Sequence, residues 1–167
     1  GAPCCNKVMT PAGLYDFNLS TGVLTLEGDL GAASDYNFEF SPNGFYLYAS
    51  IFDPNTFVSN LVQYNVFAPS QTGQTVESTA QVIVQNFNGL YLQLASDGKI
   101  YFTEQSFGFT TLLGTINCPN TSDPTVSSGV LSFPNDSLLS IGFYTLPNFP
   151  SWIFYNSYDA QIQFGPD

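Results

Sequence analysis

The sequence predicts an all-β protein built from antiparallel sheets, and three observations support this fold class. Apolar and polar residues alternate over short segments, which is the period of a half-buried strand. Turn signals separate these segments every ~8–12 residues. No window combines a sustained 3.6-residue apolar period with capping residues, and charged residues make up only 9% of the chain. Exposed helices would need more charge than this, so sheets and turns are expected.

The expected strands follow one another along the whole chain. Residues 1–13 are expected to form an irregular lead-in, and residues 117–124 carry the longest loop signal. Between the turns, alternating or β-branched segments predict the strands. These strands are expected at residues 14–19, 23–26, 37–40, 45–52, 59–67, 76–84, 90–95, 99–102, 110–116, 129–133, 138–144, 152–154 and 160–164.

A hairpin over residues 37–50 recurs at residues 90–102. The first copy turns at Asn43-Gly44 and the second at Asp97-Gly98, 54 residues later. Both dipeptides tolerate positive φ, which a tight reversal requires. A repeat of about four strands has the size of a propeller blade, and a β-sandwich whose hairpins share turn chemistry is the alternative. The predicted single domain divides into blade-like units at 14–35, 36–85 and 86–150, followed by a C-terminal strand or tail at 151–167.

Four segments resemble the blade motifs of one bacterial protein family. Residues 40–49 are similar to its "FSPDG…LYV" signature, and residues 92–101 to its "LQLAPDGKIY" motif. Residues 113–120 resemble "LGVINNPN", and residues 146–149 resemble the closing "GLPNF". Taken in order, they resemble the last propeller blades of large surface proteins of gliding bacteria, which are exported by the type IX route. The resemblance covers roughly residues 14–152 and implies an extracellular, cell-surface location.

The chain also departs from this family. The family's lysine after the turn glycine is Phe45 here, and residues 120–145 lack most of the pattern. A propeller ring needs roughly 4–8 blades, whereas this chain holds between two and three. An incomplete propeller leaves edge strands that template association with other copies, with a neighbour's strand or with other parts of a longer protein. The leading prediction is therefore a non-enzymatic extracellular structural protein, an adhesin or filament subunit that assembles through open sheet edges.

Composition excludes several function classes. The net charge is −11, the only cations are Lys7 and Lys99, and there is no arginine. Binding to nucleic acid or to anionic lipid is therefore not expected. No apolar run approaches the ~18 residues of a membrane span, and the N-terminus does not read as an intact signal peptide. The absence of histidine removes Ser-His-Asp and Cys-His catalysis, and no phosphate-binding glycine motif is present.

Two other functions remain as alternatives. A carbohydrate-binding module would stack sugars on exposed aromatic rings, for which Tyr46, Tyr91 and Trp152 are the candidates. The competing interpretation places these rings between sheets. A glycoside hydrolase fragment would need a pair of carboxylates, for which Glu39 and Glu104 are the candidates. Solvated strand or turn positions are the simpler interpretation of both acids.

The three cysteines predict a disulfide between Cys118 and either Cys4 or Cys5, which leaves one thiol for a bridge to another chain. Three reduced, buried cysteines are the alternative, and a metal site is not expected without histidine. No cofactor is expected, although loop oxygens at residues 53–55 or 120–123 would suit Ca²⁺.

Glycosylation is predicted at four positions. The N-x-[ST] acceptor pattern occurs at Asn18, Asn120 and Asn135. The segment Asp136-Ser137-Leu138 resembles the O-glycosylation acceptor of the bacterial group named above, which implies a glycan on Ser137.

Overall fold

A computed structural model of the chain describes residues 6–10, 13–28, 30, 38–53, 55–68, 73–87, 89–105 and 111–132. Over these residues the protein is all-β, which confirms the predicted fold class. One short 3-10 helix, η1 (Glu77–Thr79), accompanies the strands, and no helix in this part of the chain is long and apolar enough to span a bilayer. The strands are β1 (Lys7–Thr10), β2 (Gly13–Phe17), β3 (Leu24–Gly28), β4 (Phe38–Phe40), β5 (Tyr46–Asp53), β6 (Val58–Asn65), β7 (Gln81–Val84), β8 (Gly89–Leu94), β9 (Ile100–Gln105), β10 (Thr111–Asn117) and β11 (Thr125–Ser132).

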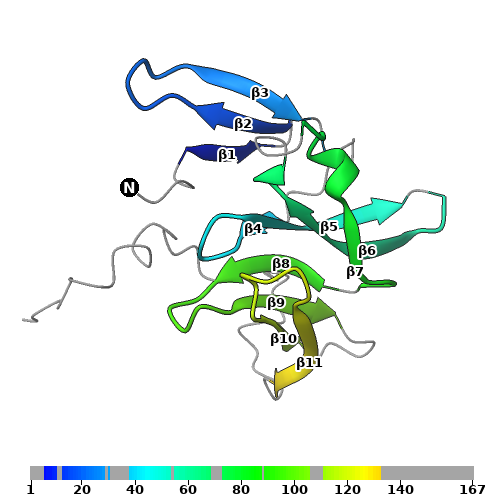
Figure 1. Cartoon of the computed structure of the whole chain (residues 1–167). Coiled ribbons are helices and arrows are strands. Elements are labelled where there is room, and N and C mark those ends of the chain that lie inside the picture. Colours follow the sequence, from blue (N-terminus) through cyan, green and yellow to red (C-terminus); the bar gives the residue numbers. More distant parts are fainter. Residues whose placement is uncertain are drawn as a thin grey trace, which may run out of the picture.

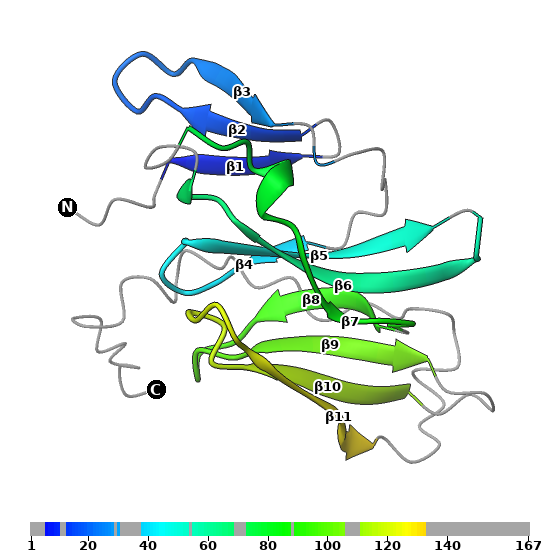
Figure 2. The ribbon, with the colours of Figure 1, turned by 45° about the vertical axis from the view of Figure 1, so that its right-hand side comes forward.

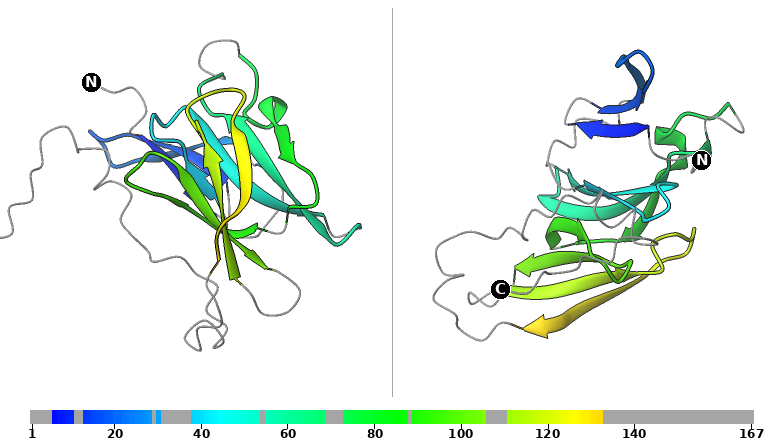
Figure 3. Two further views of the ribbon diagram at one scale, coloured as in Figure 1. Left: turned by 90° about the horizontal axis from the view of Figure 1, so that it is seen from below. Right: turned by 90° about the vertical axis from the view of Figure 1, so that its left-hand side faces the viewer.

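The strands form three antiparallel sheets, each of which meanders in sequence order (Figure 1). The first sheet is β1-β2-β3, the central sheet is β4-β5-β6-β7 and the third sheet is β8-β9-β10-β11. The central sheet lies between the other two, as the views in Figures 2 and 3 agree. Four-stranded meanders packed face to face are found both in propeller blades and in stacked sandwich sheets, so the topology fits either prediction.

The repeated hairpins of the central and third sheets have turns of the same construction. Gly44 and Gly98 both adopt the left-handed conformation, with φ of 69° and 78°. In each turn the residue before the glycine accepts a bond from the backbone N–H two positions later. The side-chain oxygen of Asn43 does so at 3.0 Å and that of Asp97 at 3.1 Å. The sequence repeat therefore corresponds to a structural repeat at the β4–β5 and β8–β9 turns.

The central sheet is apolar on both faces, which explains the nearly continuous apolar run of β5. Leu47 and Ala49 point toward the first sheet, whereas Tyr48 points toward the third. Burying each large apolar side chain contributes roughly 1.5–3 kcal/mol, so both interfaces stabilise the stack. The core between the first and central sheets contains Leu14, Leu30, Leu47, Ala49, Val62, Tyr64, Val66 and Val76. The core between the central and third sheets contains Tyr48, Leu61, Phe87, Leu92, Leu94, Ile100, Phe102 and Ile116.

A glycine on β10 makes room for a fully buried ring of the core between the central and third sheets. Gly114 lies directly opposite Phe102 of β9. A Cβ atom on Gly114 would lie 2.1 Å from Cζ of Phe102, so the ring covers the position where a side chain would be. The rings of Phe87 and Phe102 pack edge to face with centroids 4.8 Å apart. Packing therefore requires glycine at position 114.

The prediction of an irregular lead-in over residues 1–13 is wrong for Lys7–Thr10, which forms β1. Four residues are too few to display a strand period, and β1 forms because it pairs with β2. Met9 lies opposite Leu14 and packs with it against the first core. The sequence of this short segment alone does not predict its pairing with β2.

The predicted strand at residues 76–84 is also wrong over its first half, where η1 replaces it. Side-chain hydroxyls hold this turn: Ser78 Oγ donates to the Thr75 carbonyl at 2.7 Å, and Thr79 Oγ1 donates to the Val76 carbonyl at 2.6 Å. Hydroxyl side chains compete with the sheet for backbone groups in this way. The strand begins only at Gln81.

β11 begins at Thr125, before the predicted strand at 129–133. The predicted strands at 138–144, 152–154 and 160–164 lie outside the described residues.

Candidate functional site

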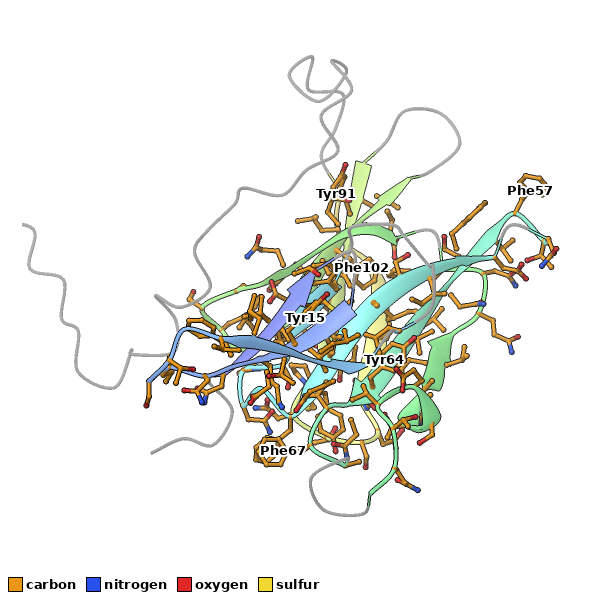
Figure 4. The ribbon with its side chains drawn as sticks, turned by 90° about the horizontal axis from the view of Figure 1, so that it is seen from above. Tyr15, Phe57, Tyr64, Phe67, Tyr91 and Phe102 are labelled. Carbon is orange, nitrogen blue, oxygen red and sulfur yellow. The ribbon has the colours of Figure 1, made fainter. Side chains whose placement is uncertain are left out.

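The first sheet exposes one apolar face. Met9 and Leu14 pack into the core between this sheet and the central one. Because successive residues of a strand point to opposite faces, Val8, Tyr15 and Phe17 point away from that core. Figure 4 looks down on this sheet from above, and Tyr15 lies over its strands.

The strand register brings these side chains into two rows. Val8 lies opposite Tyr15, which lies opposite Leu26 on β3, and Phe17 lies opposite Leu24. Val8 is 37% exposed, Leu24 49% and Leu26 54%. We call the five residues Val8, Tyr15, Phe17, Leu24 and Leu26 the outer face.

The β2–β3 turn carries two more exposed apolar side chains. Leu19 and Val23, between the two strands, are both exposed. Of the ten large apolar side chains that are exposed in the described part of the chain, five lie between residues 8 and 26. Single exposed apolar residues need no explanation, but a contiguous group marks an interaction surface.

The charges of the first sheet lie on its other side. Lys7 Nζ forms ion pairs with Asp16, at 3.4 Å, and with Glu27. Lys7 and Asp16 lie opposite each other and alternate with Val8 and Tyr15 along their strands. The outer face therefore carries no charged side chain.

The structure separates the three predicted sugar-stacking aromatics. Tyr46 packs against the core between the central and third sheets, so the interpretation as a core ring holds for it. Tyr91 is 37% exposed on β8, at the edge of the molecule in Figure 4. Trp152 lies outside the described residues.

Tyr101 was missed as a candidate, although alternation could have found it. Its neighbours Ile100 and Phe102 are fully buried, so Tyr101 points to the opposite face of the third sheet, opposite Gln93. Its hydroxyl donates a hydrogen bond to Asp97 at 2.9 Å. This bond to a carboxylate raises the pKa of Tyr101.

The β5–β6 hairpin carries a second exposed aromatic group. Phe57, at its tip, is 79% exposed and has a positive φ of 57°. Its ring contacts that of Phe52 edge to face, with centroids 6.3 Å apart. Figure 4 shows Phe57 projecting at the end of this hairpin.

The two candidate catalytic acids are not brought together. Glu39 accepts hydrogen bonds from the backbone N–H groups of Leu94 and Phe40, both at 3.0 Å, and burial raises its pKa. Leu94 pairs with Ile100, whereas Glu104 lies four residues farther along β9. The Glu104 carboxylate lies beside Gly114 and Phe102, whereas both oxygens of Glu39 are bound to backbone N–H groups. Glu39 instead joins β4 to β8.

The loops considered for Ca²⁺ use side-chain oxygens for hydrogen bonds within the protein. Asp53 accepts from the Asn55 backbone at 2.8 Å and from the Thr56 hydroxyl at 2.9 Å, and these bonds lower its pKa. In the other loop, Asn120 Oδ1 accepts from the Asn43 backbone at 3.0 Å. Among the described residues no three acidic or cysteine side chains gather as a metal site would require.

The loop after β10 joins the third sheet to the central sheet. The buried Tyr48 hydroxyl donates to the Pro119 carbonyl at 2.9 Å and accepts from Gln63 Nε2 at 2.7 Å. Gln63 Nε2 also donates to the Thr121 carbonyl at 2.8 Å. Burial raises the pKa of Tyr48, so the phenol keeps its proton and donates. This cluster is structural.

Cys118 begins this loop, exposed and with a positive φ of 52°. No disulfide forms within the described ranges, and the predicted partners Cys4 and Cys5 lie outside them, so the predicted bridge stays a prediction.

The glycan acceptors Asn18 and Asn120 lie on exposed turns. The other two predicted acceptors, Asn135 and Ser137, lie outside the described residues. Attachment of a glycan to any of the four stays a prediction.

No protein-family profile matches this sequence, and no curated protein sequence is significantly similar to it. Function must therefore be inferred from the surfaces of the molecule.

Proposed function

We propose that this chain is a non-enzymatic structural or adhesive protein of an extracellular surface, and that it works by associating through sheet surfaces left uncovered in the isolated chain. The apolar outer face of the first sheet is the observation that carries this proposal. A sheet in a monomer buries its apolar side chains, whereas this sheet also exposes apolar side chains on the side away from the core. The resemblance to surface proteins of gliding bacteria supports the extracellular location.

The acidic side chains support a non-enzymatic role. Glu39 and Asp53 bind backbone groups, Asp16 pairs with Lys7, and Asp97 holds Tyr101. Each of these carboxylates thus has a structural partner. Both oxygens of Glu39 accept bonds from backbone N–H groups, which further disfavours the glycoside hydrolase alternative.

The carbohydrate-binding alternative is favoured by one observation. Tyr91 and Tyr101 lie on adjacent strands, and the buried residues beside them, Leu92 and Phe102, point to the core. Two tyrosines on one sheet face suit stacking against sugar rings. A glycan array probed with the purified chain and with Tyr91→Ala tests this function. Absence of any signal, or a signal unchanged by the substitution, would count against it.

Oligomeric state tests the proposed function. Sedimentation velocity of the purified chain over a wide concentration range should show association, under both oxidising and reducing conditions. If only the oxidised protein associates, the contact is a cysteine bridge and the sheet surfaces are not responsible. A monomer at every concentration in both conditions would overturn the proposal.

A further inference from the structure

We propose that the outer face of the first sheet is a self-association surface, on which the same face of a second copy packs about a twofold axis. This inference rests on the proposed function, because both require the chain to self-associate. It goes further in naming the face, the partner and the symmetry of the contact.

The sequence of β3 is that of a half-buried strand whose leucines point inward. Leu24 and Leu26 alternate with Thr25 and Glu27, and such alternation indicates that the apolar side meets a core. In the isolated chain the leucines are nevertheless about half exposed, and the core lies on the other side, against Leu14. Leu24 and Leu26 are therefore fully buried, as the alternation of β3 predicts, only when a second apolar surface covers the outer face.

The face is a better contact than the edges of the sheets. The edge strand β1 has only four residues and carries Lys7. The other edge strands are similar: β4 has only three residues, and β3, β7, β8 and β11 each pair with their neighbour through an irregular register. Charged, short or bulged edge strands resist pairing with another chain, so association through these edges is disfavoured.

Charge selects where two copies can meet. The net charge of −11 makes copies repel each other, and contacts that oppose carboxylates are costly. The outer face has no charged side chain, and the charged residues of its three strands, Lys7, Asp16 and Glu27, are paired on the other side of the sheet. Two copies can therefore approach at this face without bringing acidic groups together.

The same face is the best available match for itself. The molecule already covers apolar sheet faces with other sheets, at the ~10 Å spacing of stacked sheets. The far side of the third sheet is less exposed: Thr103 and Thr115 are buried there, and Tyr101 lies opposite Gln93 and Thr115. An apolar face that meets its own copy forms an isologous contact, the commonest kind in soluble oligomers.

Paired variants test this inference. Leu24→Thr combined with Leu26→Thr keeps residues that suit a strand but removes apolar area, and each change acts twice in a twofold contact. The dimer dissociation constant should rise at least about tenfold by sedimentation velocity. The matched control is Val82→Thr with Val130→Thr, on β7 and β11, where the side chains are 50% and 43% exposed. The control should change the constant less than about twofold.

Hydroxyl-radical labelling of the wild-type chain, read by mass spectrometry, gives a second measurement that needs no variant. Labelling of Tyr15 and Leu24 should fall as concentration rises, whereas labelling of Tyr91 should not change. If the chain associates but the leucine variant associates as tightly as wild type, this inference is wrong and the proposed function stands. A monomer at all concentrations overturns both. Protection of Tyr15 in a monomer means that the chain covers its own face, and protection of Tyr91 together with Tyr15 means a head-to-tail contact. Either result overturns the inference.

Discussion

Replacing Gly114 by alanine should test the packing between β9 and β10. The new Cβ would lie 2.1 Å from Cζ and 2.2 Å from Cε2 of Phe102. Non-bonded carbon atoms prefer about 3.5–4.0 Å, so the ring or the strand must move by roughly 1.5 Å. Phe102 is fully buried and held by Phe87, and an oxygen of Glu104 lies 2.9 Å from the same Cβ position. The ring therefore has little room to yield.

Overpacking of a well-packed core costs about 1–3 kcal/mol. Because the overlap at Gly114 involves two ring carbons of a fully buried side chain, the cost should lie near about 3 kcal/mol, at the upper end. This is a large fraction of the ~5–15 kcal/mol that stabilises a typical domain. The variant should fold but unfold at a much lower urea concentration.

Urea unfolding followed by tyrosine fluorescence measures this loss. Replacing Phe102 by the smaller leucine should relieve the overlap with the added Cβ atom. The double variant Gly114→Ala with Phe102→Leu should therefore be more stable than the sum of the two single-variant losses predicts. The coupling free energy between the two positions should then be favourable by about 1 kcal/mol or more. If the free energy of unfolding of Gly114→Ala lies within about 0.5 kcal/mol of the wild-type value, the Phe102 ring does not occupy the space beside residue 114.

Three further outcomes are expected. Tyr48→Phe should cost about 1–2 kcal/mol in urea unfolding, because it removes the hydroxyl between Gln63 and the Pro119 carbonyl, and an unchanged midpoint would contradict this. Burial raises the pKa of Glu39 above its ordinary value of 4.5. The stability that Glu39 contributes relative to the Glu39→Gln variant should therefore be greatest below pH 4.5. It should be lost as the pH rises through the higher pKa of the folded state. Unfolding curves of both proteins at several pH values measure this difference, which a pH-independent gap would refute. The bonds from Asn55 and Thr56 lower the pKa of Asp53, so Thr56→Val should raise that pKa toward 3.8 in an NMR titration, and no movement would show that the hydroxyl bond is absent.

Much of the fold could be predicted from the sequence because it is built locally. Each sheet is a meander of consecutive strands, so the periodicity and turn residues that reveal the strands also reveal their pairing. The turns at Gly44 and Gly98 need a positive φ, and the glycine in each turn predicts it. By contrast, β1 is too short to show an alternating pattern. The helix η1 depends on hydrogen bonds from serine and threonine hydroxyls, which the strand-like residues around it do not predict.

The candidate site could not be predicted in the same way. Alternation shows that Leu24 and Leu26 share a face, but it does not show whether that face meets the core of this chain or another molecule. Only the position of Leu14 in the first core decides that the leucines point outward. Tyr46 and Tyr91 likewise looked equivalent in sequence, and one lies between sheets while the other is exposed.

The order of the sheets along the chain affects folding during translation. Because every sheet consists of consecutive residues, the first and central sheets can form and pack as soon as β7 has left the ribosome. The side of the central sheet that carries Tyr48 and Leu61 then has no cover until β8 to β11 have been synthesised. For the time that this takes, the nascent chain presents an adhesive apolar surface. A pause in translation within residues 89–132 would therefore lengthen the period in which chaperones or neighbouring nascent chains can bind it.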